Sequence, residues 1–176
     1  MNGIDKNLIP LYSPSEIQTR VNELGSEISE RFMHTNPLII GVLNGSFVFL
    51  ADLIRSISID CDLDFIKVQS YEKTKSSGKV NFILENSKSI EGKDVILVED
   101  IIDTGLTIKF IRHKLLKSSP KSFTIASFLL KRETHKLDFP IDFVWFEIPH
   151  KFVVGYGLDL EGKMRNLKGL YHLKND

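Results

Sequence analysis

Short apolar runs alternate with amphipathic segments along most of this chain, which predicts strands that alternate with helices. Residues 38–43 and 95–98 are continuous aliphatic runs, as expected for strands that are buried on both faces of a parallel sheet. Each is followed, after a short polar turn, by apolar residues at helical spacing, over 47–57 and from Ile108 to Leu115. Further strands are predicted at 63–69, 79–84, 122–130 and 141–146. We therefore expect an α/β fold with a mostly parallel sheet covered by helices on both sides.

Another helix is predicted near the start of the chain, after an extended lead-in over residues 1–11. The sequence Ser13-Pro14-Ser15-Glu16 has an N-cap residue, a proline in the first turn and a glutamate three residues after the cap. Apolar residues then recur on one face, at Ile17, Val21, Leu24, Ile28 and Phe32. Such a stripe indicates a helix that packs against the sheet and has no part in chemistry.

The most informative polar residues follow the 95–98 run. Glu99 and Asp100 close it, and after two isoleucines comes Asp103-Thr104-Gly105-Leu106-Thr107, where the next helix begins. The first backbone N–H groups of a helix are unpaired and carry partial positive charge, so this turn suits a phosphate. Its glycine permits close approach of an anion, and its two threonines add hydroxyl donors. A ligand that suits this turn and the three carboxylates carries a phosphate together with hydroxyls or a metal ion, as a sugar phosphate does.

The order of four apolar residues, two acids, two apolar residues and Asp-Thr-Gly-x-Thr resembles the phosphoribosyl-pyrophosphate motif of the type I phosphoribosyltransferases. The resemblance implies that Glu99 and Asp100 contact the ribose hydroxyls and a bound Mg²⁺, and that residues 103–107 hold the 5′-phosphate. It also implies that Asp103 is the general acid or base that handles a purine proton.

Later segments resemble the purine branch of this family, the hypoxanthine-guanine phosphoribosyltransferases. Phe152-Val153-Val154-Gly155-Tyr156-Gly157-Leu158-Asp159 is similar to a Phe-Val-Val-Gly-Tyr-x-Leu-Asp segment of that branch. The resemblance implies that Phe152 stacks on the base, Val153 meets the base edge and Lys131 reaches the base carbonyl oxygen. Lys151 is expected beside the base, and Asp159 near both the base and a metal-bound water.

The turn Leu43-Asn44-Gly45 matches the pyrophosphate loop of the same branch, which binds through its backbone. Asn44 stands where that branch usually has a lysine or arginine. The replacement is tolerable if backbone amides do the binding, whereas pyrophosphate binds more weakly if the side-chain charge matters. Arg165 matches the arginine that binds pyrophosphate.

A polar stretch with almost no apolar content separates the strands predicted at 63–69 and 79–84, and its composition is typical of a mobile hairpin tip. In the family, a Ser-Tyr dipeptide at this place belongs to a flexible lid over the reacting sugar. The resemblance therefore implies a lid over about 70–80, with Ser70 and Tyr71 taking part in catalysis by excluding water.

The resemblance covers about residues 38–171 and implies a single phosphoribosyltransferase domain, 1–176, with a hood formed from about 1–12 and 150–176. The implied reaction transfers the phosphoribosyl group of phosphoribosyl pyrophosphate to a 6-oxopurine and serves purine salvage. Hypoxanthine is the first choice of base and guanine the second. Mg²⁺ is the implied cofactor, and a homodimer or homotetramer is the implied assembly.

Composition narrows the function classes further. The 176 residues contain 23 basic and 23 acidic side chains, so no overall basic field indicates a nucleic-acid partner. The single cysteine, Cys61, excludes an internal disulfide, and the five histidines have no metal-ligand spacing. No apolar run approaches the roughly 20 residues of a membrane span, and the first residues do not resemble a secretion signal. We expect a cytoplasmic protein without a membrane partner.

Three other functions stay open at this point. The chain is either an enzyme or a regulator that binds phosphoribosyl pyrophosphate or a nucleotide without turnover. A phosphoacceptor receiver domain also places acids at strand ends, although it leaves the segment 152–159 unexplained. Within the enzyme class, a pyrimidine or xanthine specialist is the further alternative.

Overall fold

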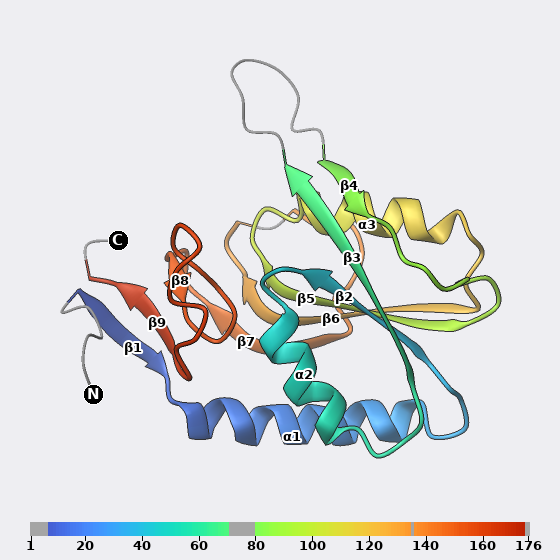
Figure 1. Ribbon diagram of the computed structural model, residues 1–176, viewed down its shortest axis with the longest axis horizontal. Helices are drawn as coiled ribbons and strands as arrows, with labels where there is room; N and C mark the ends of the chain where they lie inside the picture. The colour runs from blue at the N-terminus through green and yellow to red at the C-terminus, as the bar shows by residue number, and fades with distance from the viewer. Residues whose placement is uncertain (1–6, 71–79, 135, 175–176) are drawn as a thin grey trace.

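The computed structural model describes residues 7–70, 80–134 and 136–174, and its larger sheet has six strands in the order β4-β3-β2-β5-β6-β7 (Figure 1). All neighbouring strands in it are parallel except β3 and β4, which pair antiparallel. This confirms the predicted α/β fold with a mostly parallel sheet. The strands are β2 (Leu38–Leu43), β3 (Asp62–Ser70), β4 (Val80–Leu84), β5 (Asp94–Ile102), β6 (Ser122–Lys131) and β7 (Phe143–Ile148).

Strand β5 is longer than predicted. The sequence suggested that Glu99 and Asp100 close the strand, but both lie within it, because β6 stays paired with β5 as far as Ile102. Pairing with β2 on the other side stops at Val98. The last four residues of β5 therefore have one paired edge and one open edge, and the two acids lie where the sheet opens.

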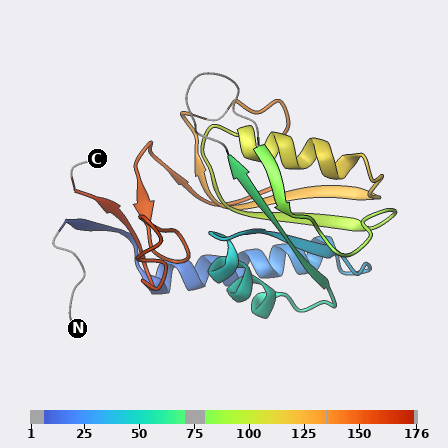
Figure 2. The same cartoon turned by 45° about the horizontal axis from the view of Figure 1, so that its top comes forward.

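Helices cover both faces of this sheet, as predicted. Helices α1 (Pro14–Arg31) and α2 (Phe47–Ser56) lie on one face, and α3 (Leu106–Leu116) lies on the other (Figure 2). Helix α1 begins with the predicted capping box, in which the Glu16 backbone N–H donates to Ser13 Oγ and the Ser13 N–H donates to the Glu16 carboxylate.

Each face of the sheet has its own core, because side chains alternate along every strand. Toward α1 and α2 the buried side chains include Ile39, Ile96, Val98, Phe49, Leu53 and Phe128. Toward α3 they include Leu38, Ile40, Val95, Leu97, Ile108 and Ile111. A central strand that is buried on both faces must be aliphatic throughout, which accounts for the continuous apolar runs in β2 and β5.

A second, three-stranded antiparallel sheet stands beside the larger one (Figure 1). Its order is β1 (Leu8–Tyr12), β9 (Leu170–Leu173) and β8 (Val153–Val154), so strands from both ends of the described chain pair with each other. The Tyr12 ring stacks on Phe146 of β7 with the ring centroids 3.9 Å apart, which ties this sheet to the larger one. The chain ends thus form one small layer, where the sequence placed the hood; that this layer covers a ligand is still a prediction.

None of the helices in the described part of the chain has both the length and the hydrophobicity of a transmembrane segment.

Candidate active site

The topology creates a crevice between β2 and β5. The chain leaves β2 through α2 toward β3, and it leaves β5 through α3 toward β6, so the two loops diverge from neighbouring strands. Ligands of open α/β sheets bind outside the carboxyl ends of the strands at such a switch point. The last residue of β2 and the three residues after it form the loop 43–46, and the loop after β5 is 103–105. These are the two turns that the sequence singled out.

The loop after β2 is in direct contact with the last part of β5. A Cβ atom built on Gly45 would lie 1.4 Å from Asp100 Oδ2, so the Asp100 carboxylate occupies the space that a side chain at position 45 would need. Ser46 is fully buried, and its hydroxyl donates to the Val42 carbonyl, which closes the turn. The Leu43-Asn44 peptide bond is cis, and the Asn44 side chain is exposed.

The turn from β5 into α3 forms a cradle that presents the first backbone N–H groups of the helix. Gly105 is the N-cap of α3 and adopts φ +83°, a left-handed conformation that favours glycine. It has no side chain to cap the helix, and the Leu106 N–H makes a long contact, 3.4 Å, to Thr104 Oγ1. A cavity of about 280 Å³ opens here, and its lining is Glu99 to Gly105, Thr107 and Ile108. Leu106, which the sequence also placed in this site, is 60% exposed and does not line the cavity.

Glu99 is buried without a complete set of partners. Its side chain lies at the opened end of β5, and Oε2 has no hydrogen-bond partner in the described part of the chain. Desolvation, reinforced by the neighbouring Asp100 carboxylate, raises the pKa of Glu99 well above its ordinary value. Desolvation also raises the pKa of Asp100, although the Ile101 N–H and the charge of Arg165 act against it. A buried acceptor with no donor is costly unless a ligand supplies one, so this pair suits ribose hydroxyls or a cation.

Asp103 is held by partners on both carboxylate oxygens. Lys131 Nζ lies 2.8 Å from Oδ2, and Thr134 Oγ1 donates to Oδ1 over 2.7 Å. Desolvation raises the pKa of Asp103, but the hydrogen bonds from Lys131 and Thr134 outweigh it, so the pKa is lowered overall. The carboxylate is therefore ionised at neutral pH and fixed in orientation, as a general base requires.

A second cavity, of about 300 Å³, lies next to the first. Its lining is Asp100, Ile101, Asp103, Lys131, Phe152, Val153, Leu158 and Asp159. Asp100, Ile101 and Asp103 also line the first cavity, so the two spaces are adjacent and share both acids. The Phe152 ring is 42% exposed, as an aromatic side chain that takes a planar ligand can be, while Val153 is buried in β8. The structure thus brings together the predicted phosphate residues and the predicted base residues.

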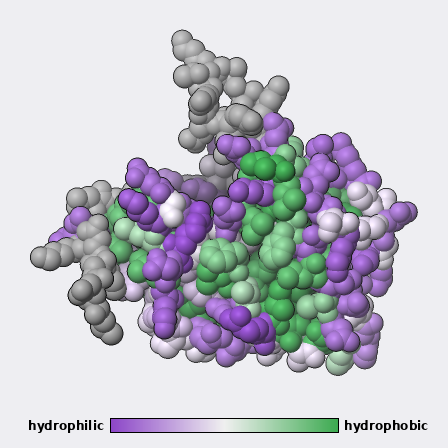
Figure 3. Space-filling view, in the orientation of Figure 1, coloured by the Kyte–Doolittle hydropathy of each residue, from purple (hydrophilic) through white to green (hydrophobic). Residues whose placement is uncertain are grey.

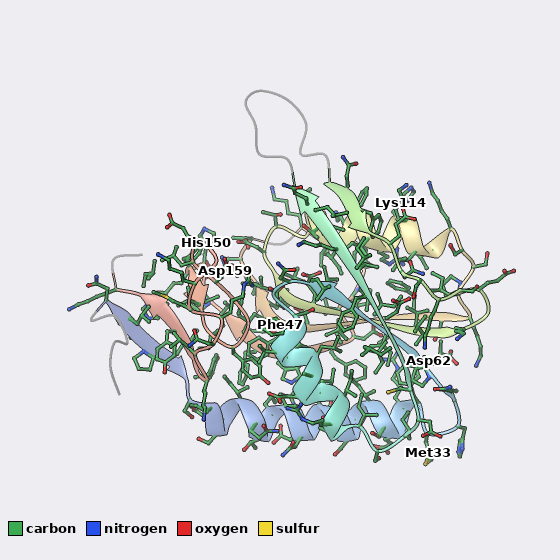
Figure 4. The ribbon with its side chains drawn as sticks, viewed as in Figure 1. Met33, Phe47, Asp62, Lys114, His150 and Asp159 are labelled. Carbon is green, nitrogen blue, oxygen red and sulfur yellow. The ribbon has the colours of Figure 1, made fainter. Side chains whose placement is uncertain are left out.

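Arg165 and Asp159 form an ion pair at the side of the site nearest α2. Arg165 Nη2 lies 2.6 Å from Asp159 Oδ1, and Arg165 Nη1 donates to the Gly157 carbonyl. A Cβ atom on Gly157 would lie 2.4 Å from the Gly45 carbonyl oxygen, so this segment packs on the loop 43–46. Figure 4 shows Asp159 across from the start of α2, where Phe47 is labelled. The predicted pyrophosphate residues therefore share one side of the crevice.

Besides Leu106, the predicted site residue Lys151 is placed differently, and Ser70 and Tyr71 cannot be compared. Lys151 does not line either cavity, and its Nζ lies 3.5 Å from Nε2 of the buried His172. Ser70 ends β3, but its side chain, Tyr71 and the rest of the predicted lid up to residue 79 lie outside the described residues.

No group of three or more histidine, cysteine, aspartate or glutamate residues in the described part of the chain converges as a metal site. Glu99 and Asp100 are neighbours, whereas the third predicted metal residue, Asp159, is paired with Arg165. An ion bound here would need most of its ligands from the substrate.

The sequence did not single out Thr134, which orients Asp103, or Leu158 and Ile101, which line the base-side cavity. Thr134 lies three residues after Lys131, in the turn that leaves β6. Threonines are common in loops, so the sequence gives no reason to choose this one, and only the fold places its hydroxyl beside Asp103.

Comparison with known families agrees with this geometry. The family model that matches is the phosphoribosyl transferase domain, over residues 12–161. Because the match spans most of the chain, the protein belongs to the phosphoribosyltransferase family.

Individual relatives narrow this class. The hypoxanthine-guanine phosphoribosyltransferase of Aquifex aeolicus (strain VF5) is 44% identical over 172 residues, which cover 97% of each chain. A crystal structure of a Staphylococcus aureus hypoxanthine phosphoribosyltransferase superposes with a TM-score of 0.93 at 37% identity, and covers 99% of this chain and 96% of that one. The Trypanosoma cruzi hypoxanthine phosphoribosyltransferase, in complex with its product IMP, gives a TM-score of 0.89 at 35% identity with 97% of each chain covered. Within its family, the chain is thus a member of the hypoxanthine-guanine phosphoribosyltransferases.

Proposed function

We propose that this site transfers the phosphoribosyl group of phosphoribosyl pyrophosphate to hypoxanthine or guanine and releases pyrophosphate, as an enzyme of purine salvage. The observation that carries the proposal is the pair of adjacent cavities that share Asp100 and Asp103. One presents the N–H groups at the start of α3 to a phosphate, and the other presents Lys131 and an aromatic ring to a base. A reaction that joins a sugar phosphate to a purine needs these two spaces side by side.

The sugar phosphate binds at the end of β5 and at the start of α3. The 5′-phosphate is placed on the backbone of 103–107, where the helix end favours negative charge. The ribose hydroxyls donate to Glu99 and Asp100 and so supply the partner that Glu99 Oε2 lacks. As the anomeric carbon loses pyrophosphate, positive charge develops on the ribose, and carboxylates held in a poorly hydrated crevice stabilise it.

Asp103 and Lys131 handle the base. The purine nitrogen that attacks the sugar must lose its proton, and the ionised Asp103 is the acceptor that the cavity offers. Lys131 is 2.8 Å from Asp103 in the free protein and donates to the 6-oxo group once the base binds. Because Thr134 still holds Oδ1, Asp103 keeps its orientation when Lys131 changes partner.

The leaving pyrophosphate is bound by the loop 43–45 and Arg165. Gly45 and Gly157 lie backbone to backbone, so this side of the crevice is a surface of peptide groups with one guanidinium. The exposed Asn44 adds hydrogen-bonding groups but no charge, and Arg165 therefore supplies the positive charge of this subsite in the described part of the chain.

Mg²⁺ fits the donor set as an ion shared with the substrate. Glu99 and Asp100 are hard oxygen donors, and Glu99 Oε2 is buried without a partner. Bound with most of its ligands from ribose and pyrophosphate oxygens, the ion would neutralise the charge of the leaving group. Asp159 would take part through a water molecule. The lid assigned to about 70–80, with Ser70 and Tyr71, would close over this side and exclude water.

We further propose that the protein is a homodimer or homotetramer. Hydrophobic residues gather on the face over α2, β3 and β4 (Figure 3), and Phe47, Leu63 and Leu84 are each more than a third exposed there. Apolar surface of this kind is typical of an interface. Sedimentation equilibrium would test the assembly. A cytoplasmic location stays a prediction.

The decisive experiment measures nucleotide formation from phosphoribosyl pyrophosphate, Mg²⁺ and each purine in turn. We expect turnover with hypoxanthine and guanine, and Asp103→Asn should lower it by roughly 10²–10⁴ while sugar-phosphate binding is kept. Binding of phosphoribosyl pyrophosphate without turnover of any purine would instead identify a regulator.

A further inference from the structure

We propose that the hydrogen bond between Tyr156 and Asp52 positions the pyrophosphate side of the site, and that these two residues set the affinity for phosphoribosyl pyrophosphate without touching it. The inference rests on the proposed function, in which the loop 43–45 and Arg165 bind the leaving pyrophosphate. Asp52 lies in α2, and Tyr156 lies in the segment that links β8 to β9.

The hydrogen bond is short and well shielded. Tyr156 Oη donates to Asp52 Oδ2 over 2.6 Å, and Tyr156 is only 6% exposed. The ring packs against Phe128 of β6 with centroids 5.0 Å apart, so the sheet fixes the tyrosine. Desolvation, together with Asp52, raises the pKa of Tyr156, and the hydroxyl keeps its proton at any physiological pH. Asp52 also pairs with Arg55, which is largely exposed.

The backbone around Tyr156 determines where Arg165 lies. The Tyr156 N–H donates to the Leu167 carbonyl over 2.8 Å, and the Gly157 N–H donates to the Arg165 carbonyl over 3.1 Å. The Arg165 guanidinium returns a hydrogen bond to the Gly157 carbonyl over 2.6 Å. Displacement of residues 156–157 therefore displaces Arg165, and with it the partner of Asp159.

Asp52 acts from the other side. Helix α2 begins at Phe47, directly after the loop 43–46, so a contact in its second turn fixes the helix against the segment that carries Arg165. The Gly157–Gly45 contact described above lies between these two parts. In Figure 1 the turns between β8 and β9 stand beside the start of α2. The Tyr156–Asp52 hydrogen bond thus joins the two parts of the pyrophosphate subsite, which are the loop before α2 and the segment that carries Arg165.

The base subsite depends on this bond much less. Lys131 and Asp103 come from β6 and from the loop after β5, and their ion pair does not involve α2. Loss of the Tyr156 hydroxyl should therefore raise the KM for phosphoribosyl pyrophosphate about tenfold, which corresponds to about 1.4 kcal/mol. The KM for hypoxanthine should change much less than the KM for phosphoribosyl pyrophosphate, because Lys131 and Asp103 stay in place.

Tyr156→Phe tests this, since it keeps the ring against Phe128 and removes only the hydroxyl. Arg55→Ala is the matched control, because it removes the other partner of Asp52 and leaves the hydrogen bond intact. Asp52→Asn keeps an acceptor for the hydroxyl and should restore most of the affinity that Asp52→Ala loses. Steady-state kinetics with each substrate, and calorimetric binding of phosphoribosyl pyrophosphate with Mg²⁺, give the readouts.

A wild-type KM and binding constant for phosphoribosyl pyrophosphate in Tyr156→Phe would overturn the proposal. Equal losses for both substrates together with a lower melting temperature would also overturn it, because they indicate a general loss of structure. If the wild-type protein binds phosphoribosyl pyrophosphate but converts no purine, the proposed reaction is wrong. The calorimetric comparison still decides the role of Tyr156 in that case.

Discussion

Gly45→Ala should separate the function of the crevice from its fold. The new Cβ would lie 1.4 Å from Asp100 Oδ2 and 3.2 Å from Asp100 Cβ. The Asp100 Cγ atom would lie 2.4 Å from the new Cβ. Because ordinary contacts begin at 3.4 Å, the carboxylate oxygen must retreat by about 2 Å and Cγ by about 1 Å, whereas the Asp100 Cβ needs to move by only a few tenths of an ångström. The carboxylate can do this by rotation, so the protein should still fold, with a stability loss in the range of about 1–3 kcal/mol that is usual for overpacking.

Rotation nevertheless takes Asp100 out of both cavities. Misplacement of a catalytic group by about 1 Å can cost 10²-fold in rate, so a 2 Å retreat should lower kcat/KM for phosphoribosyl pyrophosphate by at least about 10², equivalent to about 2.7 kcal/mol. Steady-state kinetics with the sugar substrate varied at saturating hypoxanthine measures this, and circular dichroism melts report on the fold.

Gly41→Ala is the matched control. It adds the same methyl group four residues earlier in the chain, and its Cβ would lie 2.3 Å from Leu50 Cδ2 in the core. It should lower the melting temperature without a comparable change in kcat/KM. If folded Gly45→Ala keeps kcat/KM within about threefold of the wild-type value, Asp100 is not needed where the structure places it, and the reasoning fails.

Three further predictions concern the acids and their partners. Thr134→Val removes a donor that lowers the pKa of Asp103. The acid limb of the profile of kcat/KM against pH should therefore move to higher pH. A limb that does not move would mean that Asp103 is not the titrating base. Lys131→Ala should mainly raise the KM for hypoxanthine, and an unchanged value would exclude its contact with the base. Glu99→Gln should abolish most turnover and yet keep or raise the melting temperature at pH 8. Because the pKa of Glu99 is higher in the folded than in the unfolded protein, the folded state loses stability as pH rises above the pKa of the unfolded state. The melting temperatures at pH 5 and pH 8 should therefore differ more for the wild type than for the variant.

The order of elements was readable from the sequence because each signal is local. The capping box at Ser13 and Glu16 involves residues three apart, and the aliphatic runs of β2 and β5 report burial on both faces wherever they occur. The turn Thr104-Gly105 likewise combines a residue with positive φ and a helix start within a few positions. Such features need no knowledge of the rest of the chain.

Features that depend on pairing between distant segments were not readable. The acids at 99 and 100 looked like strand ends because charged residues usually end a buried run, but continued pairing with β6 holds them in the strand. Thr134 reaches Asp103 only because β5 and β6 are neighbours, and Asp159 meets Arg165 across a turn that composition does not define.

The pairing of β1 with β9 has a consequence for how the molecule matures. All six strands of the larger sheet are available once the chain has been made as far as Ile148, but Val153 gains its neighbouring strand only when Leu170–Leu173 has been made. That strand pairs in turn with Leu8–Tyr12, near the other end of the chain. Contacts across so long a stretch of chain form late in folding. A nascent chain should therefore acquire its sugar-phosphate subsite before its purine subsite. During synthesis it should become able to bind the sugar phosphate before it can bind the purine.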